Sequence, residues 1–203
     1  MTRWLAVLGA SLLSAACAHP EGPPPEQKPA AQAPVNEARS LPPADAQALA
    51  EFSQRVTNYA ELHRKLEGTL PSLPKDTTPQ VIDNHQRSLE KLIRAERKAA
   101  KPGDIFTPET QRIFREVFAR VFTGRQGREL KATIMDENPG NIALTVNSRY
   151  PDEVPLSTVP PQVLSSLPKL PEELEYRFIG ERLILLDTHA HTIADYMDNA
   201  FPG

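Results

Sequence analysis

The sequence predicts an α+β domain in which about four helices precede a small antiparallel sheet with a C-terminal hairpin. Three observations support this fold class. Between residues 44 and 136 apolar residues recur every three or four positions, the period of a helix with one buried face. From residue 142 onward apolar and polar residues alternate, the period of a strand. Helices followed by strands along the chain are typical of α+β folds.

The first predicted helix spans residues 44–67. Gly68 and then Pro71 end it, because glycine and proline both interrupt helical sequences. Its apolar residues, which share one helical face, are Leu49, Phe52, Val56, Tyr59, Leu62 and Leu66.

Two Thr-Pro pairs predict the starts of the next two helices. Thr78 and Thr107 suit the N-cap, and the prolines after them suit the first helical position, where the missing N–H would be unpaired anyway. We expect the second helix to end near residues 101–103 and the third to end at Gly124 or Gly127. The third helix has the most apolar stripe of the chain, and we expect it to be central to the core. A shorter helix is expected over residues 126–136.

Strands are predicted in the last third of the chain. Ile142, Leu144 and Val146 alternate with polar residues, which indicates one strand. Around Gly180 two further runs of alternating apolar residues predict a hairpin, with glycine at the first turn position of a type II′ turn. The apolar residues of these runs are Leu174, Tyr176, Phe178, Leu183 and Leu185.

The amino terminus has the pattern of an export signal. After Arg3, residues 4–13 contain no ionisable side chain, yet this run is too short to cross a hydrocarbon core about 30 Å thick. Three small residues follow, and then Cys17, the only cysteine of the chain. A single thiol leaves no partner for a disulfide within the chain. An ordinary secretory signal, cut nearby after Ala18, is the alternative to lipid attachment at Cys17.

The segment Leu13-Ser14-Ala15-Ala16-Cys17 resembles the lipobox of bacterial lipoproteins, although its leucine lies four positions before the cysteine instead of the usual three. The resemblance implies cleavage before Cys17 and lipid attachment, including palmitate, to that residue. Ala18 in place of aspartate then points to the outer membrane, facing the periplasm. The predicted organisation is a signal peptide over residues 1–16, the lipidated cysteine with a proline-rich tether over 17–43, and a single domain over 44–203.

The domain sequence contains few signs of enzymatic chemistry. It has no Gly-x-Ser-x-Gly, P-loop, dinucleotide-binding or His-Glu-x-x-His motif. We therefore expect a non-enzymatic binding or interaction module with no cofactor. Export excludes nucleic acid as a partner and leaves an envelope protein, an anionic lipid or a wall polymer. One basic helix face suits an anionic surface, although it also suits solvent or the acidic C-terminal part of the chain; its residues are Arg87, Lys91, Arg94, Lys98 and Lys101.

The alternative function is a metal-dependent hydrolase that uses Asp187, His189 and His191 as ligands, with Asp195 as general base. If the last strand continues through this segment, the three ligands share one face. If a helix begins there, Asp187, His191 and Asp195 share a side and His189 points away.

A catalytic zinc usually has three protein ligands and a water. The third could be Asp187 or Asp195, or a histidine from the helices. His85 lies on the apolar stripe of the second helix and His63 lies beside Leu62, so we also expect both to be hydrogen-bonded core residues. A surface or hydrogen-bonded pair at the end of a strand is the competing interpretation of His189 and His191.

Overall fold

The computed structural model describes residues 41–137 and 142–201, and these described residues belong to one compact unit. The predicted signal peptide, Cys17 and the tether up to residue 40 lie outside the described residues. Among the described residues, no helix combines the length and the apolar character that crossing a membrane requires.

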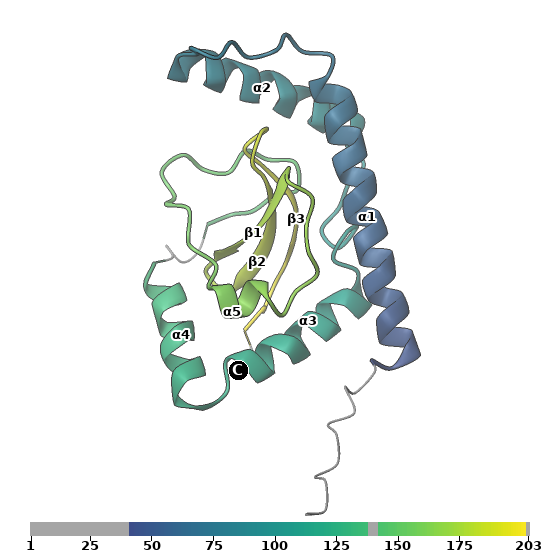
Figure 1. Ribbon diagram of the computed structural model, residues 1–203, viewed down its shortest axis with the longest axis vertical. Coiled ribbons are helices and arrows are strands. Elements are labelled where there is room, and N and C mark those ends of the chain that lie inside the picture. Colours follow the sequence, from purple (N-terminus) through teal and green to yellow (C-terminus); the bar gives the residue numbers. More distant parts are fainter. Residues whose placement is uncertain (1–40, 138–141, 202–203) are drawn as a thin grey trace, which may run out of the picture. The chain divides into compact units, whose positions relative to one another are not determined.

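The predicted α+β class is confirmed, with helices first and an antiparallel sheet last (Figure 1). The strand order β1-β2-β3 makes β2 the central strand. The elements are α1 Pro43–Glu67, α2 Pro79–Glu96, α3 Pro108–Val121, α4 Gly124–Asp136, α5 Pro161–Leu164, β1 Leu174–Ile179, β2 Arg182–Asp187 and β3 Thr192–Met197.

Both predicted Thr-Pro helix starts are confirmed. The Thr78 side chain accepts a hydrogen bond from the backbone N–H of Val81, and the Thr107 side chain accepts one from Thr110. The end of α2 differs from the prediction, because the helix stops at Glu96. Its next carbonyl, that of Arg97, accepts a hydrogen bond from the Asn147 side chain at 2.8 Å. The α2 end is therefore tied to the segment between α4 and α5.

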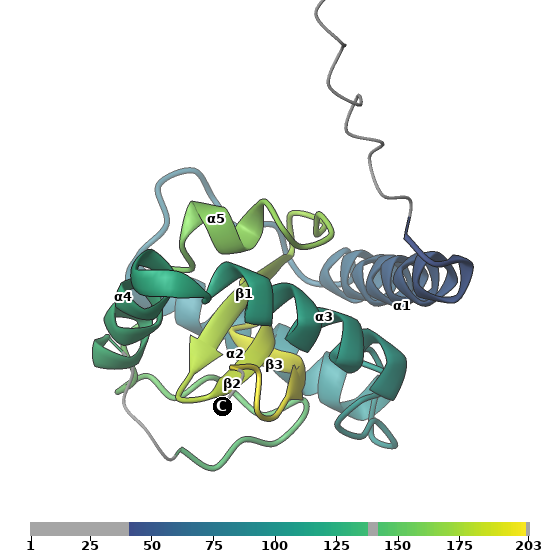
Figure 2. The same cartoon turned by 90° about the horizontal axis from the view of Figure 1, so that it is seen from below.

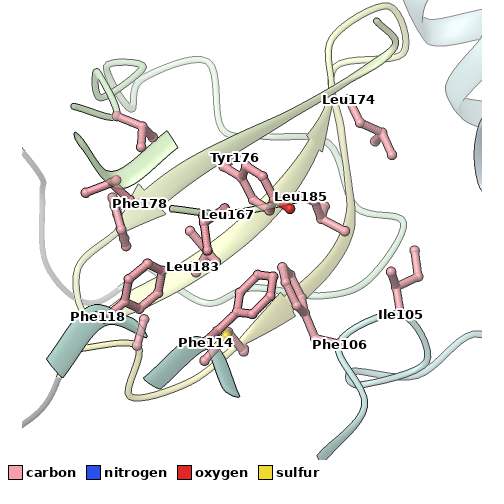
Figure 3. Close-up of a cluster of buried hydrophobic side chains, with 14 of the residues drawn as sticks. Ile105, Phe106, Phe114, Phe118, Leu167, Leu174, Tyr176, Phe178, Leu183 and Leu185 are labelled. Carbon is pink, nitrogen blue, oxygen red and sulfur yellow. The ribbon is translucent and has the colours of Figure 1, made fainter. Parts of the chain in front are cut away.

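The two faces of the sheet are buried against different parts of the chain. Figure 2 shows α3 and α5 on one side of the sheet, while the segment after α4 passes on the other side. The helix side holds the larger cluster, part of which is drawn in Figure 3 and includes Phe114, Phe118, Tyr176, Phe178, Leu183 and Leu185. The opposite side holds Tyr150, Val154, Ile179, Ile184, Leu186 and Ile193.

The prediction of a strand over residues 142–146 is wrong. Ile142 and Leu144 pack against the sheet face as apolar residues, but this segment forms no strand, and only Arg149 makes an isolated bridge to β3. The alternation of apolar and polar residues in this segment therefore belongs to a loop that covers the sheet and buries every second side chain against it. The hairpin of β1 and β2 is confirmed, with Gly180 at a positive φ of 54°. A third strand, β3, completes the sheet and was not predicted.

A bulge in β3 brings Asp195 to the helix side of the sheet, where it fixes the loop between α2 and α3. The pairing of β2 with β3 shifts between Leu185 and Leu186. The buried Asp195 carboxylate accepts backbone hydrogen bonds from Gly103, Ile105 and Phe106 at 3.0, 2.7 and 2.8 Å. Three amide groups of this loop thus have a side chain as their partner.

We predict that Asp195→Ala lowers the free energy of unfolding by at least about 3 kcal/mol, because it leaves several buried N–H groups without acceptors. Urea denaturation measures this change. Glu153→Ala, at an exposed position, is the control and should change stability by less than about 0.5 kcal/mol. A loss at Asp195 as small as in the control would contradict the structural role given to this carboxylate.

Candidate metal centre

The last residue of β2 faces α1. Alternation along the strand puts Leu183, Leu185 and Asp187 on the helix side of the sheet, and Asp187 is fully buried there. Its Oδ2 atom accepts hydrogen bonds from the Tyr59 hydroxyl at 2.8 Å and from His63 Nδ1 at 2.6 Å. Its Oδ1 atom accepts backbone hydrogen bonds from the turn after β2, at 3.1 and 2.8 Å. Four donors therefore compensate the burial of this carboxylate.

His63 occupies a buried position of α1, four residues after the buried Tyr59. An ionised carboxylate only accepts, so the hydrogen bond with Asp187 puts a proton on Nδ1 of His63 and directs Nε2 the other way. Nε2 lies 3.2 Å from an oxygen of Glu67, one helical turn further along. Burial lowers the pKa of His63, but the hydrogen bond and the charge of Asp187, followed by Glu67, outweigh burial and raise this pKa above its ordinary value.

The turn between β2 and β3 brings His189 to the same place. His189 Nδ1 lies 3.1 and 3.2 Å from the two oxygens of Glu67, and its ring lies edge-on to His63 with centroids 5.2 Å apart. Burial raises the pKa of Glu67, but the hydrogen bond and the charge of His189, and then those of His63, outweigh burial and lower it. One potential ligand atom from each of His63, Glu67 and His189 lies within 4.8 Å of the other two.

A fourth side chain borders this group from α2. His85 Nε2 lies 3.6 Å from Oε1 of Glu67, and the His85 side chain is only 11% exposed. Beside these two residues is a pocket of about 380 Å³, which Arg64, Leu70, Ser72 and other residues also line. The group is therefore reachable from the surface, although His63 itself is buried.

The structure separates the three residues that the sequence analysis grouped as ligands. Asp187 and His189 lie at the cluster, but His191 lies 3.8 Å from Asp152 and packs its ring against Tyr150. Neither expected geometry occurs, because the chain reverses over residues 188–191 and neither extends the strand nor starts a helix.

His63 from α1 meets His189 of the turn, as one alternative allowed. His63 is also the buried, hydrogen-bonded residue that the sequence predicted. Asp195 lies elsewhere, bound to the loop before α3. Glu67 was not predicted as a site residue, and its only signal in the sequence is its place one helical turn after His63.

The donor set fits a divalent transition metal. Ligand atoms about 2.0–2.1 Å from a tetrahedral zinc are about 3.3–3.4 Å from one another. The 3.2 Å separations of Glu67 Oε2 from His63 Nε2 and from His189 Nδ1 are close to this value. His63 also has the outer partner that metal-bound histidines usually have, since its other nitrogen donates to Asp187. The three groups could bind zinc with small side-chain adjustments.

Comparisons of the chain with protein-family models, with curated proteins and with solved structures found no match.

We predict that Tyr59→Phe lowers the free energy of unfolding by about 1.5–3 kcal/mol, because the lost hydrogen bond has a charged, buried acceptor in Asp187. Tyr176→Phe is the matched control. Its hydroxyl donates to the neutral carbonyl of Pro168 at 3.1 Å, so its removal should cost only about 0.5–1.5 kcal/mol. Urea denaturation in the presence of a chelator compares the two. Equal losses would contradict the larger contribution assigned to the hydrogen bond between Tyr59 and Asp187.

Proposed function

We propose that the protein is a lipid-anchored module of the cell envelope that binds a divalent transition metal, with zinc as the first candidate. His63, Glu67 and His189 are the proposed ligands, and the role is binding, without catalysis. The observation that carries the proposal is the meeting of these three groups, from α1 and the turn between β2 and β3, within 4.8 Å. Two imidazoles with a carboxylate are a donor set that suits zinc and the neighbouring transition metals.

The hydrogen bond between Asp187 and His63 supports a metal site whose ligand is already oriented before metal binds. A histidine on an exposed surface is free to rotate, whereas His63 is fully buried and its Nδ1 atom is held at 2.6 Å from Asp187. This bond fixes the ring and leaves Nε2 for a metal. Glu67 and His189 have side chains 30% and 45% exposed, so a metal ion can reach the group from solvent.

The location is proposed from the amino-terminal sequence. A lipid on Cys17 would attach the chain to a membrane, and the proline-rich segment after it would hold the domain away from that surface. The outer membrane, facing the periplasm, is the proposed site. Anchored there, the module would bind metal in the periplasm, where an envelope protein, an anionic lipid or a wall polymer could be its further partner.

A metal-dependent hydrolase is the second candidate function, and the pocket of about 380 Å³ beside Glu67 and His85 favours it. Catalysis needs a metal position left open for water. Hydrolysis of activated esters or phosphoesters by the zinc-loaded protein, lost on chelation, tests this candidate.

We predict that the protein binds one zinc per chain in isothermal titration calorimetry. His63→Ala and His189→Ala each remove a ligand and should weaken binding at least about tenfold. His191→Ala is the matched control, because His191 comes from the same turn but lies against Asp152 and Tyr150, so its affinity should be unchanged. No binding by the wild type, or an equal loss in the control, would contradict the proposed centre.

A separate experiment tests the anchor. In bacteria that express the full chain we predict incorporation of labelled palmitate and recovery of the protein with membranes. Cys17→Ser should abolish the labelling and release the protein, because two or three acyl chains contribute about 0.8 kcal/mol for each buried CH₂ group. An unlabelled wild type, or a variant that stays equally membrane-bound, would contradict lipid attachment at Cys17.

A further inference from the structure

We propose that His85 becomes the fourth metal ligand, so that the metal closes a three-histidine, one-glutamate centre and pins the amino-terminal half of α2 to the rest of the domain. This inference rests on the proposed function, and it concerns the regulation of the same site. The structural basis is that His85 comes from a different helix than His63 and Glu67 and lies beside Glu67.

The position of His85 already favours coordination. It lies one helical turn before Leu89 and two turns before Ile93, the two buried residues of α2. These two pack with Leu66 of α1 and Ala190 of the turn, so the same face of α2 directs His85 toward the end of α1. His85 Nε2 reaches 3.6 Å from Oε1 of Glu67, which is slightly beyond a hydrogen bond. This contact is close to the spacing of two ligands on one zinc, about 3.3–3.4 Å.

Glu67 explains how four groups can share one ion. Its Oε2 atom faces His63, its Oε1 atom faces His85, and both oxygens contact His189. All three histidines thus surround one carboxylate. A cation between them would replace histidine–carboxylate hydrogen bonds with metal–ligand bonds. Ligand atoms of His63, Glu67 and His189 already lie within 4.8 Å of one another, so coordination by all four groups requires His85 to move toward the other two histidines.

The amino-terminal half of α2 has few other attachments. Residues 79–88 contain no buried side chain, and Val81 and Ile82 are 41% and 38% exposed. Asp83 makes one ion pair outside the helix, with Arg149 at 3.1 Å. Segments with so little buried apolar contact open locally at low free energy. A metal bond to His85 would add a strong attachment where the helix is weakly held.

Four protein ligands also determine what the site can do. A zinc bound by four side chains has no open position for water, whereas catalytic zinc sites keep one. Closure by His85 would therefore let the bound metal determine how well ordered the amino-terminal half of α2 is, including its exposed apolar residues Val81 and Ile82. Closure by His85 also assigns the site to metal binding and excludes hydrolysis in the closed form.

The test is a zinc titration of the full chain, purified in detergent, as wild type, as His85→Ala and as His85→Phe, which keeps a ring without a ligand atom. His191→Ala is the matched control. We expect both His85 variants to bind zinc at least about tenfold more weakly than wild type and control. Hydrogen exchange of residues 78–88 should slow on addition of zinc in wild type and control, and should not change in the His85 variants.

The outcomes separate this inference from the proposed function. If wild type binds zinc and both His85 variants bind it equally well, the metal centre stands and the role of His85 is overturned. Unchanged exchange over residues 78–88 in zinc-loaded wild type also overturns it. If wild type binds no zinc, both proposals are overturned. Hydrogen exchange without metal checks that the variants are folded.

Discussion

The burial of Asp187 is the constraint on which the rest of the structure depends. A carboxylate with no exposed surface costs several kcal/mol unless partners compensate it, and the loss of one partner of a buried ion pair commonly costs about 3–5 kcal/mol. The partners of Asp187 come from two places, α1 and the turn after β2. Because Asp187 needs its partners from α1 and from the turn at the same time, α1 must lie across the end of the central strand β2. Tyr59 extends this network further, since the Arg97 guanidinium at the end of α2 lies 4.8 Å above its ring.

The burial of Asp187 also orients the side chains of the proposed metal centre. Because Asp187 holds one nitrogen of His63, the other nitrogen points toward Glu67, and the turn that donates backbone hydrogen bonds to Asp187 also carries His189. Stability and chemistry therefore share one group of residues. The neighbouring carboxylate Asp195 has the equivalent role for the loop before α3, but its partners are backbone amides and it forms no site. The two carboxylates differ in their partners, because the backbone N–H groups that bind Asp195 can only donate hydrogen bonds, whereas the imidazole that binds Asp187 can also bind a metal.

The local elements could be predicted from the sequence because their signals are local. The Thr-Pro caps and the glycine turn of the hairpin act within four residues, and α2, α3 and the pair β1–β2 follow them. The loop over residues 142–146 was misassigned because a segment that covers a sheet buries alternate side chains as a strand does. The site depends on long-range geometry: Asp187 and His63 are 124 positions apart, and no local pattern states that they meet. The pairing of His189 with His191 failed because four turn residues separate β2 from β3, so the two rings point to different neighbours.

The most direct test of this account is X-ray absorption spectroscopy at the zinc edge of the loaded protein, because it reports the metal's ligands without reference to stability. We expect nitrogen and oxygen ligands about 2.0–2.1 Å from zinc, with outer-shell scattering typical of several imidazole rings. The imidazole signal should decrease in His63→Ala and remain in His191→Ala. A spectrum with no imidazole scattering, or one that His63→Ala leaves unchanged, would show that zinc binds elsewhere and would contradict the centre built on Asp187 and His63.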